Sequence, residues 1–306
     1  MTALTRREAC ARLALGGTAL AVAPALGAQE SAFRLRYIVA SSLYGTLPLA
    51  EILPEVAKHG SDTIDLWPKP HGSQREQVDE MGLDRAAALF AAHKVKVGCL
   101  TRYDLGPARL APEIDVGRRF GAKVIVTGAG KASGPDLKAA IRGFVEGLKP
   151  TAEAAAAAGI TIAIENHSGQ MLATPDGVRW FAEAATPANL GVALAPYHLP
   201  QDAELLGALI RDLGPKLALF YAWQHGKGSD AKNPPPKEDE VLQLPGRGAL
   251  DFAPMIAALR TIGYRGWTSV FMHPIPRGVP ILPTAAASTV ALNKAREYLD
   301  GLCQKG

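Results

Sequence analysis

Ile160-Thr161-Ile162-Ala163-Ile164-Glu165-Asn166-His167 is the stretch of the sequence that decides the fold. Its first five residues favour a β-strand and are apolar on both faces, as in parallel strands that helices cover on both sides. Ala157-Ala158-Gly159 comes directly before it, and glycine accepts the left-handed conformation that ends a helix. Because three polar side chains follow the apolar run, the stretch predicts a helix–strand unit with functional groups at the carboxyl end of the strand.

Seven further β-prone runs share this pattern, and helical stretches rich in alanine and leucine separate them. The eight predicted strands are Leu35–Ala40, Thr63–Trp67, Val95–Thr101, Lys123–Thr127, Ile160–Asn166, Leu190–Ala195, Leu217–Trp223 and Trp267–Met272. Eight βα units in one chain favour closure into a (β/α)8 TIM barrel over an open sheet. The first run is followed by Ser41-Ser42-Leu43-Tyr44-Gly45, which lacks the glycine pattern of dinucleotide-binding folds. We therefore predict an α/β protein in which residues 29–306 form one TIM barrel domain.

Residues that typically start or end helices lie between the predicted strands and support these boundaries. Gly60, Gly121 and Gly263 each stand just before a predicted strand and are expected to end helices. Thr174-Pro175 predicts a helix start, with threonine as the cap and proline at the first helical position. One long polar insertion, residues 225–248, follows the seventh strand and is expected to overhang the active face. It is either a lid or a loop without a catalytic role.

The first 28 residues are expected to be an export signal. Arg6-Arg7 precedes an apolar run from Leu13 to Leu26, and small residues allow cleavage after Ala28. The run has about 14 residues and contains two glycines and a proline, so it is too short and too broken to cross a bilayer. We predict a cleavable twin-arginine signal peptide at residues 1–28, a periplasmic location and no stable membrane insertion after cleavage. An N-terminal membrane anchor is the alternative.

The charge of the remaining chain gives no support to a nucleic-acid partner. The formal net charge is +4, and the arginines at positions 6, 7 and 12 against Glu8 contribute +2 of it. No block of lysine and arginine and no basic stripe with aromatic residues is present in the sequence. Cys99 and Cys303 are far apart and belong to no CxxC motif, so they predict no disulfide framework. The oligomeric state stays open, with a homo-oligomer as one alternative.

Histidines gather where the predicted strands end. Five of the seven follow strands two, five, six, seven and eight, and these are His71, His167, His198, His225 and His273. Glu165 adds a carboxylate near the end of an apolar strand, where burial would be unfavourable without a cation. Glu165, His198, His225 and His273 come from successive strands and are predicted to hold one divalent ion. Mixed nitrogen and oxygen ligands suit Mn²⁺, Zn²⁺, Co²⁺ or Fe²⁺ better than Ca²⁺.

Several motifs in this order resemble the sugar-phosphate isomerase/epimerase group of the xylose isomerase-like TIM barrels. They are Ile164-Glu165-Asn166-His167, Gly191-Val192-Ala193-Leu194 with His198 following, Gly246-Arg247-Gly248-Ala249-Leu250-Asp251-Phe252 and Gly263-Tyr264-Arg265-Gly266-Trp267. The resemblance extends over essentially the whole mature chain. It implies a divalent metal held by Glu, Asp, His and Glu from strands five to eight, and two glutamates that move protons on and off carbon.

The sequence departs from that pattern at two positions. Glu165 matches the first Glu of the family, His225 the His of strand seven, and His198 the His three residues beyond the usual Asp. The expected Asp is Ala195 and the expected final Glu is Phe271, and neither side chain binds a metal or transfers a proton. Epimerisation needs an acid and a base on opposite faces of the substrate, so another group must replace the lost carboxylate.

His273 and His198 are the candidates for that replacement, because His273 lies two residues past Phe271. The predicted catalytic residues are therefore Glu165, His273 and His198. One Glu and three His would make a bound metal a stronger Lewis acid, which favours lyase or hydrolase chemistry more than in the usual family member.

Other polar and aromatic residues after the strands are predicted to contact the substrate. They are Trp67, Lys69, His71, Arg102, His167, Gln224 and Arg277. Packing at the rim is the alternative for Trp67, and a surface salt bridge is the alternative for Arg277.

These observations predict a periplasmic, metal-dependent enzyme that isomerises or epimerises a small-molecule carbohydrate, or acts on a keto-sugar or glycoside by elimination. A carbohydrate-binding barrel that has lost its chemistry is the alternative raised by Ala195 and Phe271. A DNA-repair endonuclease of the related endonuclease IV type would need a richer set of metal ligands, and export and near-neutral charge argue against it.

Overall fold

The computed structural model describes residues 33–305, so the predicted signal peptide at residues 1–28 lies outside the described part of the chain. Within it the strands are β1 (Arg36–Tyr37), β2 (Val39–Ala40), β3 (Thr63–Leu66), β4 (Lys96–Thr101), β5 (Val124–Gly128), β6 (Thr161–Glu165), β7 (Leu190–Leu194), β8 (Leu217–Ala222) and β9 (Trp267–Val270). All of their pairings are parallel, in the order β1-β9-β8-β7-β6-β5-β4-β3-β2.

The first and last strands in this order, β1 and β2, are consecutive in the chain, and this closes the barrel. β1 pairs with β9, whereas β2 pairs with β3, and only Ile38 separates β1 from β2. The backbone of Ile38 continues the ladder by donating a hydrogen bond to the carbonyl of Thr268 at 3.0 Å. The predicted TIM barrel is therefore confirmed. Each predicted strand agrees with the structure to within two residues at either end, apart from the break at Ile38.

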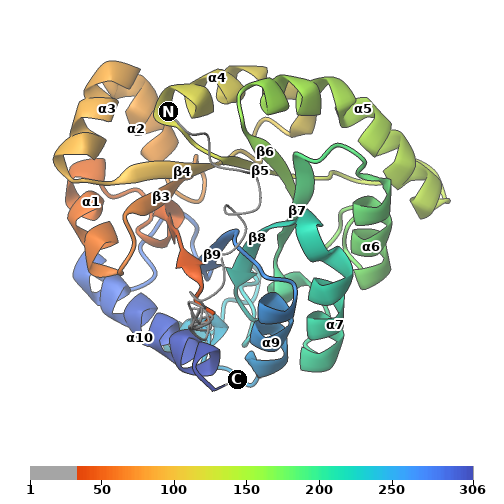
Figure 1. The fold of residues 1–306 in the computed structure, drawn as a ribbon. Helices are drawn as coiled ribbons and strands as arrows, with labels where there is room; N and C mark the ends of the chain where they lie inside the picture. Colours follow the sequence, from red (N-terminus) through yellow and green to blue (C-terminus); the bar gives the residue numbers. More distant parts are fainter. Residues whose placement is uncertain (1–32, 306) are drawn as a thin grey trace, which may run out of the picture. The chain divides into compact units, whose positions relative to one another are not determined.

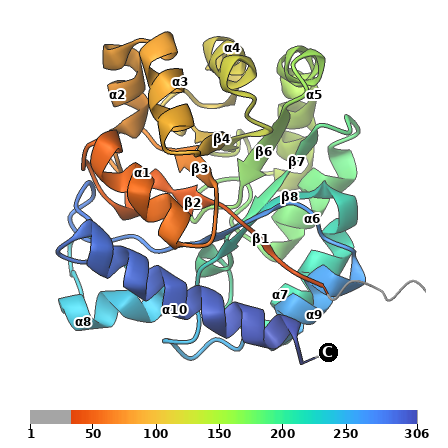
Figure 2. The same ribbon diagram turned by 60° about the vertical axis from the view of Figure 1, so that its left-hand side comes forward.

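Helices form a ring around these strands (Figure 1). They are α1 (Leu49–Lys58), α2 (Gln74–Met81), α3 (Leu83–Ala92), α4 (Ala111–Phe120), α5 (Leu137–Ala157), α6 (Pro175–Ala184), α7 (Ala203–Leu213), α8 (Lys237–Glu240), α9 (Ala253–Thr261) and α10 (Ala285–Cys303). Two helices, α2 and α3, separate β3 from β4, and Gly82 divides them at a φ of 84°. In Figure 2 the C-terminal helix α10 crosses the outside of the barrel beside α1 and α9.

Local signals in the sequence fix several helix ends. Gly60, Gly121 and Gly263 adopt φ values of 69°, 74° and 60°, the left-handed region in which glycine is favoured. The Thr174 side chain caps α6 by accepting a hydrogen bond from the backbone N–H of Gly177 at 3.1 Å. These predicted boundaries are confirmed.

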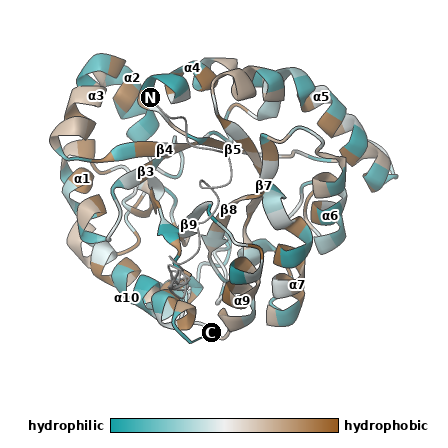
Figure 3. Cartoon of the chain, in the orientation of Figure 1, coloured by the Kyte–Doolittle hydropathy of each residue, from teal (hydrophilic) through white to brown (hydrophobic). Residues whose placement is uncertain are grey.

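The strands are buried from both sides, as their sequences predict. Every residue of β5 and β7 is buried. Figure 3 shows apolar colouring along the strands and a mixture of polar and apolar colouring on the surrounding helices. No helix among residues 33–305 combines the length and the hydropathy needed to cross a membrane. Cys99 and Cys303 are both buried free thiols.

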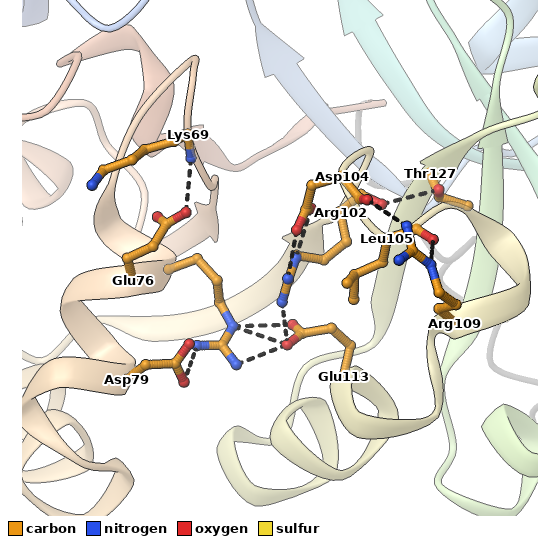
Figure 4. A network of polar contacts seen from close by, with 10 residues as sticks. Lys69, Glu76, Asp79, Arg102, Asp104, Leu105, Arg109, Glu113 and Thr127 are labelled. Carbon is orange, nitrogen blue, oxygen red and sulfur yellow. Dashed lines mark hydrogen bonds and ion pairs between the residues drawn. The ribbon is translucent and has the colours of Figure 1, made fainter.

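A buried ion cluster joins the helical layer to the end of β4 (Figure 4). Glu113 on α4 accepts hydrogen bonds from Arg75 on α2 at 2.7, 3.0 and 3.1 Å and also pairs with Arg102, which follows β4. The side chains of Glu113 and Arg75 are only 2% and 5% exposed. Burial makes the carboxylate essential, since without it two guanidinium groups would lose their shared counter-charge.

We predict that Glu113→Gln lowers the free energy of unfolding by about 2 kcal/mol, because it removes the buried counter-charge that Arg75 and Arg102 share and leaves each with only its more exposed partner, Asp79 or Asp104. Urea unfolding of the purified protein measures this change. Asp115→Asn is the matched control on the same helix, since the Asp115–Arg118 pair is exposed. It should change stability by about 0.5 kcal/mol or less. Equal effects of the two substitutions would contradict a structural role for the cluster.

Candidate active site

Two carboxyl groups lie inside the carboxyl-terminal end of the barrel. Glu165 is the last residue of β6 and is 4% exposed, and Asp65 lies in β3 and is fully buried. Asp65 accepts hydrogen bonds from Trp67 Nε1 at 2.6 Å and from Thr101 Oγ1 at 2.8 Å. No hydrogen bond to the Glu165 carboxyl group is present among residues 33–305, and His198 Nε2 lies 3.8 Å from its Oε1.

Burial makes both carboxyl groups weak acids. Desolvation raises the pKa of Glu165 well above its usual value, and the negative charge of Asp65 raises it further. Desolvation also raises the pKa of Asp65 to about 7, although the hydrogen bonds from Thr101 and Trp67 lower it in part. Burial therefore favours the neutral carboxylic acid form of Glu165, which is the form that donates a proton.

His198 places an imidazole beside this acid. Its Nε2 lies 3.8 Å from Glu165 Oε1, is buried, and has no hydrogen-bond partner in the described part of the chain. Its Nδ1 lies 3.3 Å from Ser168 Oγ. Burial lowers the pKa of His198 to about 3, and the charges of His167 and Arg277 act in the same direction. The distance alone would allow an ion pair, but both pKa shifts favour a neutral acid beside a neutral base.

His167 packs directly against His198. The two ring centroids are 4.0 Å apart at an interplanar angle of 39°. His167 Nδ1 lies 2.8 Å from the carbonyl oxygen of Ser168, which assigns the proton to Nδ1 and leaves Nε2 as an acceptor. The structure thus brings Glu165, His198 and His167 together at the ends of β6 and β7, as the sequence predicted.

Phe271 is the centre of an aromatic cluster in which the family pattern has a glutamate. Its ring stacks on Trp67 with centroids 5.2 Å apart at 24°. It also makes T-shaped contacts with Tyr221, Trp223 and His273, at centroid distances of 5.2, 5.0 and 4.8 Å. One face of Trp67 is therefore covered by Phe271, and its Nε1 is bound to Asp65. This arrangement places Trp67 in the packing of the rim rather than leaving that face open for a sugar ring.

The other lost carboxylate is replaced by a backbone contact. Asn166 donates from Nδ2 to the carbonyl of Ala195 at 2.9 Å and accepts from the Ala195 N–H at 2.7 Å. All of these groups are buried. The pair of hydrogen bonds ties the ends of β6 and β7 together without any side-chain donor from position 195.

His273 packs against the aromatic cluster through Trp67, Trp223 and Phe271. Its ring stacks on His71 with centroids 4.8 Å apart at 29°. Its backbone N–H donates to Gln243 Oε1 at 3.1 Å, and its carbonyl accepts from Gln243 Nε2 at 3.0 Å. Burial lowers the pKa of the His273 imidazole well below its usual value, and it lowers that of His71 to about 4. No hydrogen bond or ion pair among residues 33–305 joins His273 to Glu165.

The predicted four-ligand metal site does not fit this donor geometry. His225 is exposed, and its ring stacks on Tyr197 with centroids 5.0 Å apart. Of the four predicted ligands, only Glu165 and His198 approach each other. Across residues 33–305, no group of three or more His, Cys, Asp or Glu side chains is arranged to hold a metal ion. The physical reason is aromatic packing, because the His225 ring stacks on Tyr197 and the His273 ring stacks on His71.

Two predicted substrate contacts have structural partners instead. Gln224 is buried, donates to the carbonyl of Leu244 at 2.8 Å and accepts from the N–H of Leu250 at 2.9 Å. Both ends of its amide are therefore used within the protein. Arg102 donates to both carboxylate oxygens of Asp104, at 2.9 and 2.7 Å, and pairs with Glu113 in the buried cluster of Figure 4.

Lys69 and Arg277 have different surroundings. Lys69 is exposed, and its backbone N–H donates to Glu76 Oε1 at 3.0 Å (Figure 4). Arg277 is half-buried, and its guanidinium donates to the carbonyl of Pro274 at 3.1 Å and to Ser229 Oγ at 3.4 Å. No carboxylate in the described residues lies within 4.0 Å of it, so the salt bridge considered from the sequence is not formed.

The insertion after β8 is anchored at its end. Gln243 accepts a hydrogen bond from Trp223 Nε1 at 3.0 Å and holds the backbone of His273. Gly248 is required here, because a Cβ at this position would lie 2.4 Å from Gln224 Oε1. The end of residues 225–248 therefore belongs to the wall of the site rather than to a free loop.

Asp65, Asn166 and Gln243 were missed as site residues by reasoning from the sequence. A signal for Asp65 was present, since an acidic residue inside an apolar strand must be protonated or paired when buried. Asn166 stood in the quoted motif, but nothing in the sequence indicated that its amide would bind the backbone of Ala195. Gln243 lies in the polar insertion, where periodicity gives no information about burial.

Comparison with solved structures shows the same barrel. The IOLI protein, described with a bound zinc atom, has a TM-score of 0.67 and 20% identity over 87% of this chain and 98% of its own. L-ribulose 3-epimerase has a TM-score of 0.65 and 17% identity over 89% of this chain and 95% of its own. The probable 3-DHS dehydratase AsbF of Bacillus anthracis has a TM-score of 0.64 and 13% identity over 87% of this chain and 99% of its own. At identities of 20% or less, these structural similarities show a shared fold alone.

The sequence comparisons agree with the fold. Among curated proteins, none matches this sequence. The model of the xylose isomerase-like TIM barrel family matches residues 53–291, which is more than three quarters of the chain. The matched region begins in α1 and ends in α10, so it includes β3 to β9 and both members of the Glu165–His198 pair. The chain therefore belongs to the xylose isomerase-like TIM barrel family.

Proposed function

We propose that the protein is an enzyme that moves a proton at a carbon next to the carbonyl of a keto-sugar or a related carbohydrate, leading to isomerisation, epimerisation or elimination. The observation that carries this proposal is the pairing of Glu165 with His198. A buried carboxylic acid lies 3.8 Å from a buried imidazole nitrogen that has no other partner in the described residues. Epimerase and dehydratase activities in the names of similar structures support the same class of reaction.

The two groups have complementary roles in such a reaction. His198 Nε2 is an unpartnered acceptor and takes the proton from carbon. Glu165 holds a proton that it donates to the carbonyl oxygen on which negative charge develops. General acid and base groups in these roles typically accelerate a reaction by about 10²- to 10⁴-fold each. Asp65 contacts Trp67 and Thr101 and acts on Glu165 through its charge, so we regard it as a positioning residue.

The predicted divalent ion enters this proposal only as a hypothesis. The xylose isomerase-like resemblance and the zinc atom of the IOLI structure favour it. The arrangement of the side chains favours it less, since no three His, Cys, Asp or Glu side chains of the described residues are arranged to hold a metal ion. We therefore derive no step of the reaction through a metal.

The cellular location is also a proposal. The paired arginines and the apolar run of residues 1–28 support export by the twin-arginine route and activity in the periplasm. A substrate there would be a free sugar or glycoside, and a sugar phosphate would be rare.

Glu165→Gln should lower kcat by about 100-fold or more on any substrate that the wild-type protein turns over, because an amide cannot donate the proton. Screening of ketoses and 3-keto-glycosides by sugar analysis provides the substrate. Glu153→Gln, an exposed position on α5, is the matched control and should leave kcat unchanged. Full turnover by Glu165→Gln would overturn the proposed chemistry.

Asp65→Asn should change how stability depends on pH. The pKa of Asp65 rises from 3.8 to about 7 on folding, so between these values the unfolded chain has released a proton that the folded chain keeps. This group therefore lowers the stability of the wild-type protein as the pH rises from about 4 to 7, by up to about 4 kcal/mol, and Asp65→Asn loses less stability over this range because only the contribution of Glu165 remains. Urea unfolding of both proteins across this range measures the difference. Parallel pH profiles for wild type and variant would contradict the burial of an acid at position 65.

Metal removal distinguishes a metal-dependent reaction from proton transfer by Glu165 and His198 alone. We expect less than one tightly bound Zn²⁺ or Mn²⁺ per chain in elemental analysis of the exported protein, and turnover that survives chelation, because too few donors converge. One ion per chain that is lost in His198→Ala, together with loss of turnover on chelation, would restore the metal-dependent mechanism.

A carbohydrate-binding barrel without catalysis is the second candidate. Phe271 and the Asn166–Ala195 contact favour it, because they occupy positions where the family pattern has reactive carboxylates. The Glu165→Gln variant also distinguishes a binding protein from an enzyme. A binding protein keeps most of its affinity for the sugar and shows no turnover in either form, whereas an enzyme keeps affinity and loses turnover only in the variant.

A further inference from the structure

Arg277 carries a charge for which the surrounding protein provides no counter-ion. It stands in the loop after β9 and is half-buried. The nearest acidic group that acts on it is Glu240, but both oxygens of Glu240 accept hydrogen bonds from Lys237 at 3.0 Å, and one also accepts from the N–H of Ile275 at 3.1 Å. No ion pair within 4.0 Å joins Arg277 to any carboxylate in residues 33–305.

The guanidinium also keeps unused hydrogen-bond donors. A guanidinium has five N–H donors, and two hydrogen bonds are present, to the carbonyl of Pro274 at 3.1 Å and to Ser229 Oγ at 3.4 Å. Nη1 and Nη2 each make one of these bonds, and no hydrogen bond from Nε is present among residues 33–305, so three N–H groups are left for a ligand. Burial lowers the pKa of Arg277, which is the direction expected when a cation loses water without gaining an anion.

The position of Arg277 connects it to the Glu165–His198 pair. Ser229 Oγ lies 3.0 Å from Tyr197 OH, and the Ser229 N–H donates to the same hydroxyl at 2.9 Å. The Tyr197 ring stacks on Trp223 with centroids 4.0 Å apart and meets the edge of His198 at 4.9 Å. Pro274, which accepts from Arg277, directly follows His273. Arg277 is therefore connected to His198 through Ser229 and Tyr197, and its charge acts on the His198 imidazole.

We propose that Arg277 binds the carboxylate of an acidic sugar, so that the substrate class is a uronic or other sugar acid rather than a neutral sugar. The proposal rests on the proposed function for the location of the reaction. A carboxylate matches the planar fork of a guanidinium and supplies one negative charge to one unpaired positive charge. A phosphate monoester would bring about two negative charges to the one positive charge of Arg277, which is a poorer match in charge.

Binding of two matched sugar pairs tests the proposal without requiring turnover. The probes are D-glucuronate against D-glucose and D-galacturonate against D-galactose, titrated into the mature protein and followed by calorimetry and by the Arg277 Nε–H signal in NMR spectra. We expect at least one uronate to bind about tenfold or more tightly than its neutral partner and to shift the Arg277 signal. Arg277→Gln should remove this preference, and Arg277→Lys should keep part of it, since lysine retains the charge but not the fork.

Arg211→Gln, at an exposed arginine on α7, is the control and should keep the full preference for the uronate. The proposal is overturned if both uronates bind no better than their neutral partners, which includes the case in which none of the four binds, or if Arg277→Gln keeps the preference. If Arg277 fails this test but Glu165→Gln still abolishes turnover, only the acidic substrate class is wrong and the proposed function stands. If Glu165→Gln turns over substrate as fast as the wild-type protein, the proposed function itself is wrong.

Discussion

The burial of two carboxyl groups in the mouth of an apolar barrel is the constraint on which the site depends. Asp65 is fully buried and Glu165 nearly so, and no lysine or arginine pairs with either in the described residues. Such groups are stable only in the neutral form or with several donors. Asp65 has the donors of Trp67 and Thr101, whereas Glu165 has an unprotonated imidazole beside it. The same burial that costs stability keeps a proton on Glu165.

The aromatic cluster around Phe271 explains how the barrel tolerates the loss of the usual carboxylates. Where another Glu would need a cation, Phe271 fills the space with a ring that packs on Trp67 and Trp223. Removing an anionic ligand and adding apolar area lowers the local dielectric, which strengthens the pKa shifts of the remaining groups. The change from carboxylate to aromatic ring therefore shifts the site away from metal binding and towards proton transfer by neutral groups.

The fold was predictable to the level of single elements, because strands that are apolar on both faces and glycines at helix ends leave few alternatives. The site was predictable only in part. Glu165, His167 and His198 were expected together because successive strand ends are neighbours in a barrel. His225 was expected in the same group, but its ring turns outward onto Tyr197, a rotamer choice that strand order does not determine. The ion cluster of Arg102 and Glu113 was not predicted either, since its members come from elements far apart in sequence.

The protonation state of Glu165 at neutral pH is the most direct test of this account. Infrared difference spectra between the wild-type protein and Glu165→Gln, recorded at pH 7 in the absence of substrate, report it through the carbonyl stretch of the side chain. The account predicts the band of a protonated carboxylic acid in the wild type and its loss in the variant. A difference spectrum that shows only the bands of an ionised carboxylate would contradict it, because Glu165 could then not act as the proton donor.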